Sequence, residues 1–349
     1  MQQKIICKKC NSSSIIKKGI KKKKLQSIQR YFCKDCNSIF TLSATKSTYP
    51  IQTILKAVSH YNLGYNLSQV QKMLESRTKI KIPTSTISNW INQHKNTCTF
   101  ARLRKIAIKQ YSQKNIIQKQ ALNHIQPYTF KHHQAKLDYA LKENPKFSKL
   151  KEYIEKINSK QFPHHIFTYN KDNSNKENKN NQRASKIKFN HLKIAHIKKQ
   201  NLANKLTALA LNLAKNNQQR HQAIQDFFLI NDSTTIAAEL PIYLTNWDAG
   251  YYKNQKGFTF PLNNCPTPIT GHIDLLQIRN GLIHILDYKP EAEKINATEQ
   301  LTLYSLALSR KLNLKLTNFK AAWFDENNYH EFFPLHAVYG KKQIFPLII

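Results

Sequence analysis

The chain of 349 residues carries 55 lysines and arginines against 20 aspartates and glutamates, a formal net charge of +35. This length suggests two or three domains, and a hydrophobic content of 40% is enough for packed cores. So large a positive excess indicates a polyanionic partner, nucleic acid first and an anionic membrane surface second. The sequence has no run of 18 apolar residues, which argues against a membrane-spanning helix.

The N-terminus and the cysteine usage indicate a compartment. The first ten residues, MQQKIICKKC, lack the apolar core of a secretory signal, so we expect a cytoplasmic protein associated with the nucleoid. In such a reducing compartment, six cysteines favour metal ligands or free thiols over disulfides.

Four of the six cysteines lie in residues 1–45 as two pairs, Cys7-x2-Cys10 and Cys33-x2-Cys36. Zn²⁺ binds four thiolates in a tetrahedron, and a two-residue spacer lets both sulfurs of a pair turn toward one ion. A core this small needs a metal to be stable. We therefore predict a Zn²⁺ site here, with an iron–sulfur site as the weaker alternative.

The stretch between the two cysteine pairs is basic, which favours contacts with phosphates. It holds Lys17, Lys18, Lys21, Lys22, Lys23, Lys24 and Arg30. Aromatic residues flank the second pair in QRYFCKDCNSIF, residues 29–40. By its charge this stretch, with Arg30, is expected to contact DNA, and a merely solvated turn is the alternative. The cysteine pairs, the basic stretch and these aromatics resemble the zinc ribbon at the N-terminus of some transposases.

Residues 48–96 have the apolar spacing of three short helices. In the third, Ile87, Trp90 and Ile91 would face inward. Its other face would expose polar side chains: Ser85, Ser88, Asn89, Gln93 and Lys95. Short polar side chains can read base edges, and the arrangement resembles transposase-type helix-turn-helix domains, in which the third helix enters the major groove. An ordinary helical bundle is the alternative.

Residues 97–199 are basic and weakly patterned, with helices expected near 132–142 and 147–158. Within this region, YNKDNSNKENKNNQRASK (169–186) lacks apolar periodicity, which predicts a flexible linker. Residues 200–349 alternate strand and helix signals and hold most of the acids, so we predict a separate α/β domain there.

A β-hairpin is predicted in this last segment by IDLLQIRNGLIHILDYKP. Asn280-Gly281 is a strong signal for a two-residue type I′ turn, and pairing outward from this turn places Asp274 opposite Asp287. Side chains alternate along a strand, so both aspartates and Lys289 emerge on one face at one end of the hairpin.

Two opposed carboxylates in an apolar hairpin repel each other unless one is protonated or both share a cation. Mg²⁺ binds through one or two carboxylates plus substrate phosphate. A neighbouring lysine can orient a water or stabilise charge that develops on phosphate. The alternative is an ion pair of Lys289 with one aspartate. The helix expected after Pro290 then places Gln300 and Tyr304 one turn apart on one face.

The combination of Asp274, Asp287-Tyr288-Lys289 and Gln300-x3-Tyr304 resembles the PD-(D/E)xK nuclease superfamily, closest to the branch with RecB-type and Cas4-type nucleases. The resemblance covers residues 200–335 and implies a restriction-endonuclease-like α/β core, a mixed sheet flanked by helices. It implies that the two aspartates bind Mg²⁺ or Mn²⁺ together with the Tyr288 carbonyl. It further implies that Lys289 positions the attacking water, while Gln300 and Tyr304 contact the DNA backbone.

This branch often adds an upstream histidine ligand. His221, ahead of the predicted strand TIAAELPIYL, is the candidate, and Glu239 within that strand is its rival. Many Cas4-type members also hold an iron–sulfur cluster with four cysteines. The matching region here has Cys265 alone, so we expect no such cluster, and we expect Cys98 and Cys265 to be ordinary thiols.

These features predict a metal-dependent DNA nuclease that its own zinc ribbon and helix-turn-helix direct to DNA, in a mobile-element or host-defence setting. The alternative is a DNA-binding regulator with a catalytically silent nuclease fold. A transposase would need a further carboxylate triad, which the rest of the sequence lacks. No membrane partner is expected. Helix-turn-helix domains often act as dimers, which leaves a homodimer open, although no coiled-coil pattern supports one.

Overall fold

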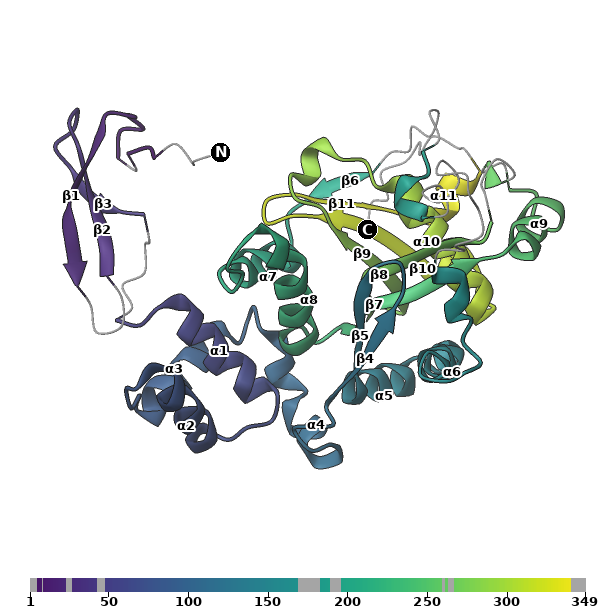
Figure 1. The fold of residues 1–349 in the computed structure, drawn as a ribbon, viewed down its shortest axis with the longest axis horizontal. Helices are drawn as coiled ribbons and strands as arrows, with labels where there is room; N and C mark the ends of the chain where they lie inside the picture. The colour runs from purple at the N-terminus through teal and green to yellow at the C-terminus, as the bar shows by residue number, and fades with distance from the viewer. Residues whose placement is uncertain are drawn as a thin grey trace. The chain divides into compact units, whose positions relative to one another are not determined.

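The computed structural model describes residues 5–7, 9–22, 27–42, 48–168, 183–188, 196–258, 261–262 and 267–339 (Figure 1). The chain divides into two compact units. The first comprises Met1–Tyr61 and Tyr65–Gln93, and the second comprises Asn62–Gly64 and His94–Ile349. Among the described residues, no helix is both long and apolar enough to cross a membrane.

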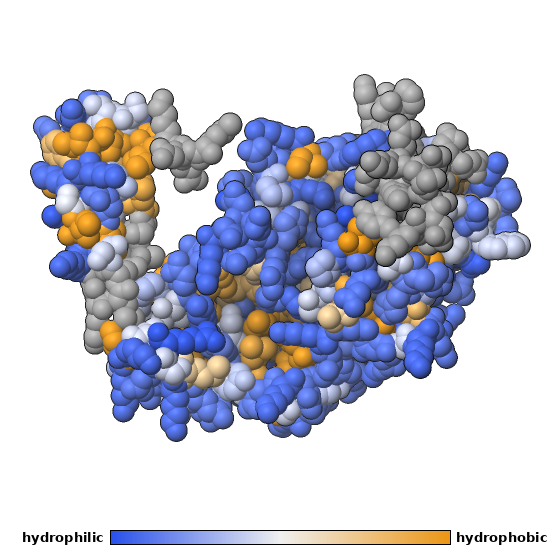
Figure 2. All heavy atoms as spheres, viewed as in Figure 1, coloured by the Kyte–Doolittle hydropathy of each residue, from blue (hydrophilic) through white to orange (hydrophobic). Residues whose placement is uncertain are grey.

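The N-terminal part of the first unit is a small antiparallel sheet in the order β1 (Ile15–Lys22), β2 (Ser27–Cys33) and β3 (Ile39–Thr41). Five large apolar side chains in and beside this sheet are exposed, and Figure 2 shows orange patches on its surface. The five side chains are Ile6, Ile16, Ile20, Ile39 and Leu42, each between 45% and 59% exposed. So little apolar burial leaves the cysteines as the main source of order in this sheet.

The three helices expected in residues 48–96 are present as α1 (Ile51–Asn62), α2 (Leu67–Thr78) and α3 (Thr84–His94). A capping box starts α2, because Asn66 and Gln69 each accept from the other's backbone amide at 2.9 Å. The helices share one apolar core, formed by Ile54, Ala57, Val70, Leu74, Ile82, Ile87 and Trp90. The periodicity therefore predicted both the helices and their inward faces.

The second unit is built on a mixed sheet, and eight strands of the described residues form it in the order β4-β5-β7-β8-β9-β10-β11-β6. The pair β9–β10 is parallel, and the other neighbours are antiparallel. The strands are β4 (Ile117–Asn123), β5 (Pro127–His133), β6 (Ile197–Lys199), β7 (Thr235–Leu244), β8 (Ile269–Arg279), β9 (Leu282–Tyr288), β10 (Phe319–Phe324) and β11 (Tyr329–Phe332). The expected mixed sheet is thus confirmed.

Helices flank this sheet (Figure 1). Two of them carry residues of the site: α8 packs on β7 and β8, and α10 packs on β7, β9 and β10. The helices of this unit are α4 (Arg104–Gln110), α5 (Gln134–Glu143), α6 (Ser148–Lys156), α7 (Leu202–Leu211), α8 (Arg220–Asn231), α9 (Asn246–Asn254), α10 (Thr298–Leu312) and α11 (Pro334–Val338).

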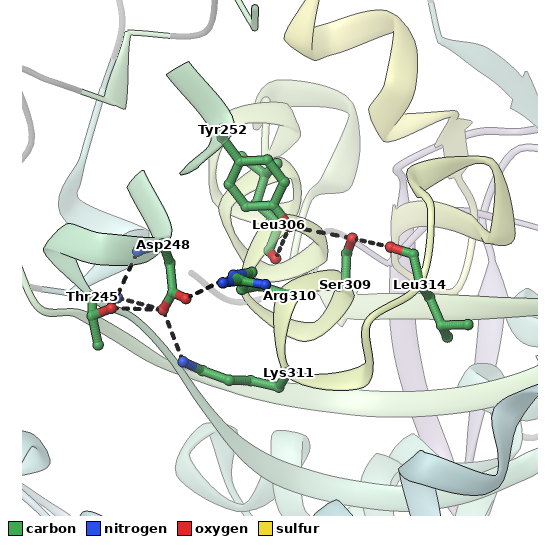
Figure 3. Close-up of polar contacts among 8 residues, drawn as sticks. All are labelled: Thr245, Asp248, Tyr252, Leu306, Ser309, Arg310, Lys311 and Leu314. Carbon is green, nitrogen blue, oxygen red and sulfur yellow. Dashed lines mark hydrogen bonds and ion pairs between the residues drawn. The ribbon is translucent and has the colours of Figure 1, made fainter. Parts of the chain in front are cut away.

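Polar contacts fix the C-terminal half of α10 against α9 (Figure 3). The buried Asp248 carboxylate lies 2.8 Å from Lys311 Nζ and 3.3 Å from Arg310 Nε, and it accepts a hydrogen bond from Thr245 N at 2.9 Å. The Tyr252 hydroxyl donates to the carbonyl of Leu306 at 2.8 Å. These contacts hold the helix whose other half carries Gln300 and Tyr304.

The structure differs from the sequence-based organisation in two places. The region 97–199 was expected to be separate from the α/β domain, yet β4 and β5 extend the same sheet as β7. Of the linker expected at 169–186, the structure describes residues 183–186. Ala184 there is 1% exposed and belongs to the main core, the large cluster of buried apolar residues of the second unit. A single buried alanine has no periodicity, so the sequence could not reveal this anchor.

Candidate active site and metal centre

The hairpin of β8 and β9 has the predicted turn and register. Asn280 and Gly281 both have left-handed φ angles of 53° and 69°, as a type I′ turn requires. The ladder runs from Arg279 opposite Leu282 as far as Leu275 opposite Leu286. Beyond this last pair, the Asp274 Oδ2 atom accepts a hydrogen bond from the Tyr288 amide at 3.0 Å. The two aspartates therefore lie at the end of the hairpin, where regular pairing stops.

Asp287 is the most enclosed acid of this site, with a side chain only 3% exposed. Its Oδ2 atom lies 2.6 Å from Lys289 Nζ, and its Oδ1 atom accepts from Gln300 Nε2 at 3.2 Å. Gln300 Nε2 also lies 3.1 Å from the Tyr304 hydroxyl. Asp287 Oδ2 thus has the Lys289 ammonium as its close partner. A buried carboxylate is stable as an anion only beside a cation, and Lys289 supplies that charge here.

Helix α8 supplies the second half of the site. His221 Nδ1 lies 3.5 Å from Asp274 Oδ2. One turn later, Gln225 Nε2 donates to Glu239 Oε1 at 2.7 Å and lies 3.5 Å from Asp274 Oδ1. Gln225 was not predicted, although its spacing of four from His221 on one helix face could have indicated it.

Burial shifts the ionisation of these groups. Desolvation, reinforced by the neighbouring Asp274, raises the pKa of Asp287 to about 6 and that of Glu239 to about 7. Burial alone would lower the pKa of Lys289, but Asp287 beside it raises that pKa overall. The pKa of His221 is likewise raised, because Asp274 outweighs the desolvation. Carboxyls with raised pKa values beside cations are typical of functional sites.

Two backbone features adapt the sheet to this site. Glu239 has a φ of 55°, a left-handed conformation that a non-glycine residue adopts at a cost of about 1–3 kcal/mol. Gly271 lies directly under the Tyr304 ring, and a Cβ atom at this position would collide with that ring. Backbone strain and close approach at one cavity are expected where function, rather than packing, selects the geometry.

These side chains line one cavity of about 300 Å³. It brings together the predicted residues His221, Glu239, Asp274, Asp287, Lys289, Gln300 and Tyr304. It also contains residues that the sequence did not indicate: Gln126, Tyr128, Arg183, Ser185, Thr270, Gly271 and His272. Both candidates for the upstream ligand, His221 and Glu239, reach the cavity, so the geometry leaves that choice open.

The four predicted cysteines form the second site. Cys7 Sγ lies 3.5 Å from Cys36 Sγ, and Cys10 Sγ lies 3.6 Å from Cys33 Sγ. All four sulfurs lie within 4.8 Å of one another, the only such group of ligand atoms within the described residues. In a tetrahedron with Zn–S bonds of about 2.3 Å, sulfurs are roughly 3.8 Å apart. The cluster is therefore compatible with a zinc ribbon.

Local backbone geometry explains why the cysteine pairs turn inward. Asn11 and Asn37, each directly after a pair, have left-handed φ angles of 58° and 53°. Hydrogen bonding, first from the Ser38 hydroxyl, lowers the pKa of Cys7 to about 6 and so favours its thiolate, the form that binds metal. The backbone hydrogen bond at Ser12 lowers the pKa of Cys10, but hydrogen bonds with the other three cysteines of the cluster together with burial outweigh it and raise that pKa to about 12, so the thiols of the cluster do not ionise alike. Burial raises the pKa of Cys98, which lies outside the cluster, to about 12. Cys265 lies outside the described residues.

The residues expected to contact DNA in the first unit lie on its surface. Ser85, Asn89 and Gln93 are exposed on α3, and Ser88 is partly exposed. Arg30 is exposed on β2. Lys95, exposed just beyond the end of α3, belongs to the second unit. Lys23 and Lys24 of the basic stretch lie outside the described residues.

Comparison with family models decides the class of the second unit. Residues 132–332, more than half of the chain, match the model of the PD-(D/E)XK nuclease superfamily. The chain belongs to this superfamily. Members of the PD-(D/E)XK superfamily are usually metal-dependent nucleases. The match starts in β5, well before residue 200, in agreement with the sheet. No curated protein and no solved structure matches the chain.

The residues of the cavity fit a hard divalent cation. Mg²⁺ takes oxygen ligands, and Asp274 and Asp287 offer carboxylate oxygens at the end of one hairpin. The buried Asp287 carboxylate is paired with Lys289, and Asp274 is close enough to raise its pKa. The donor set thus agrees with the metal dependence that is usual in the superfamily.

Proposed function

We propose that this protein is a Mg²⁺- or Mn²⁺-dependent deoxyribonuclease that hydrolyses phosphodiester bonds. The observation that carries the proposal is the buried Asp287 carboxylate, 2.6 Å from Lys289 Nζ and 3.2 Å from Gln300 Nε2 in a cavity shared with Asp274. Membership of a nuclease superfamily supports the same reaction.

Each cavity residue that the sequence predicted has a role in this proposal. Asp274 and Asp287 would hold the cation together with the Tyr288 carbonyl and either His221 or Glu239. The bound cation would neutralise negative charge that develops on the phosphate. Lys289 orients the attacking water. Gln300 donates to Asp287 Oδ1 and to the Tyr304 hydroxyl, and so holds the Asp287 carboxylate in place.

The first unit would bring the nuclease to DNA. A zinc ribbon held by Cys7, Cys10, Cys33 and Cys36 presents a basic face, and α3 of a helix-turn-helix reads bases in the major groove. The net charge of +35 supports binding to a polyanion. The pairing of such modules with a nuclease suggests a mobile-element or host-defence setting.

Cleavage of linear and circular plasmid DNA tests the nuclease directly. Wild type should cut in Mg²⁺ or Mn²⁺, and Asp287→Ala and Lys289→Ala should each lose activity roughly 100-fold or more, because each removes a group that acts on the transition state. Lys294→Ala removes an exposed lysine paired with Glu291 outside the cavity, and it should keep full activity.

The outcomes separate the candidate functions. Wild type that degrades linear but not circular DNA would be an exonuclease, and wild type that cuts both would be an endonuclease. Binding of DNA without cutting in either metal would overturn the proposal and favour a DNA-binding regulator with a silent nuclease fold.

A further inference from the structure

One wall of the nuclease cavity comes from parts of the chain that precede α7. The turn between β4 and β5 supplies Gln126, β5 itself supplies Tyr128, and the segment 183–188 supplies Arg183 and Ser185. The carboxylates and Lys289 come instead from β7, β8 and β9 or directly after them. We call the wall formed by Gln126, Tyr128, Arg183 and Ser185 the second wall, and none of these four lining residues is a carboxylate.

Arg183 is held at this wall by its neighbours in the sequence. Ala184 is 1% and Ile187 8% exposed, and both belong to the main core. The backbone of Arg183 forms a parallel β-bridge with Thr270, another residue of the cavity. The β-bridge and these two buried side chains anchor the segment, and the half-buried Arg183 side chain lines the cavity.

The partner of Arg183 is a neutral phenol. Its Nη2 atom donates to the Tyr128 hydroxyl, and burial raises the pKa of Tyr128, so the phenol stays protonated. Tyr128 in turn stacks on His272, with ring centroids 3.8 Å apart and planes at 16°, and His272 Nε2 lies 2.8 Å from His124 Nδ1. This stack fixes the phenol and, through it, one end of the guanidinium.

The charges of the cavity leave Arg183 available for an anion. The other strong cation of the lining, Lys289, is 2.6 Å from Asp287. Within the described residues Arg183 forms no ion pair with a carboxylate. A guanidinium has five N–H donors in a planar fork that matches a phosphate, and Tyr128 occupies one of them.

We propose that Arg183, braced by Tyr128, binds a phosphate group of the DNA strand in the cavity, a phosphate other than the one that is cleaved. The inference rests on the proposed nuclease function, since it assumes that a strand enters this cavity. Thr270, where Arg183 forms its bridge, precedes Asp274 by four residues on β8, or about 14 Å of strand. That separation favours a flanking phosphate, so Arg183 would set the path of the strand past the carboxylates.

The test pairs substitutions of the protein with substitutions of the DNA. Wild type, Arg183→Ala and Lys188→Ala bind a short oligonucleotide whose phosphates are replaced one at a time by a neutral methylphosphonate. Binding is measured by anisotropy without added divalent metal, and cleavage is measured after Mg²⁺ or Mn²⁺ is added. Lys188 is an exposed lysine of the same segment and does not line the cavity, so it controls for loss of one positive charge.

One modified position should weaken binding about tenfold or more in wild type and in Lys188→Ala, but less than twofold in Arg183→Ala, because the variant has already lost that contact. Arg183→Lys should keep part of the coupling. Equal sensitivity of all variants at every position would overturn the inference. If all variants are equally sensitive but wild type cleaves the oligonucleotide, the nuclease function is supported and only the role of Arg183 is wrong. If coupling is found but nothing is cleaved, Arg183 binds phosphate and the nuclease proposal is wrong.

Discussion

Gly271 has no chemistry of its own, yet the site depends on its missing side chain. The Tyr304 ring fills the space that a Cβ atom would occupy, and the Tyr304 hydroxyl lies 3.1 Å from Gln300, which holds Asp287. A helix residue and a strand residue thus fit together only because one of them lacks a side chain.

Replacing Gly271 by alanine should therefore reduce both activity and stability. The added methyl forces Tyr304 out of place, and overpacking of this kind lowers the free energy of unfolding by about 1–3 kcal/mol. DNA cleavage should fall by roughly tenfold or more, and urea unfolding should report the loss of stability. Gly250→Ala is the control, since a Cβ atom there meets nothing within 4 Å. A second substitution, Tyr304→Leu, should restore stability but not cleavage. Unchanged stability of Gly271→Ala would contradict the close packing.

Between elements, buried polar contacts hold the helices in place. Lys136 of α5 is fully buried, and its Nζ atom donates to the carbonyl of Leu229 near the end of α8 at 2.6 Å and lies 4.7 Å from the centre of the Phe100 ring. Helix α8 carries His221 and Gln225, so this contact helps to position the site. Burial lowers the pKa of Lys136 to about 7.

This lowered pKa predicts a pH-dependent stability. Between pH 7 and about 10.5 the unfolded chain holds a proton on Lys136 that the folded protein has released, so the free energy of unfolding rises with pH. Lys136→Met should reduce that slope by up to about 1.4 kcal/mol per pH unit, measured by urea unfolding between pH 7.5 and 9.5 as approximate limits. Lys142→Met, on an exposed position of the same helix, should leave the slope as in wild type. A Lys136→Met variant with the wild-type slope would show that this lysine stays charged when folded.

For the whole molecule, the two units should depend on metal differently. The small sheet buries little besides Cys7, Tyr31 and Cys33. The second unit instead has a large apolar core, which includes the buried apolar side chains of α10. We therefore expect the small sheet to need a metal to fold, whereas the three helices of the first unit and the second unit have apolar cores of their own.

Cys33→Ser should accordingly remove the zinc and weaken DNA binding without destabilising the second unit. Elemental analysis of purified wild type should give one zinc per chain, and the variant should give almost none. The urea midpoint of the second unit should stay unchanged. Cys98→Ser alters a buried thiol outside the cluster and should retain the zinc. A full zinc content in Cys33→Ser would refute a four-cysteine site.

The features that sequence predicted are those whose geometry is local. An Asn-Gly turn sets the pairing of the strands on either side of it, so the positions of Asp274 and Asp287 followed from counting. Gln300 and Tyr304 share a face because they are one helical turn apart. The paired cysteines likewise needed only their own short spacers and the hairpin between them.

The sequence by itself thus determined the pair of opposed aspartates, Lys289, the helix with Gln300 and Tyr304, and the cysteine cluster. Only the tertiary structure decided the second wall of the cavity, with Tyr128 and Arg183, and joined β4 and β5 to the sheet. Those contacts link residues more than 50 positions apart through packing and a single β-bridge. Such long-range contacts follow no period in the chain, so no local pattern in the sequence predicts them.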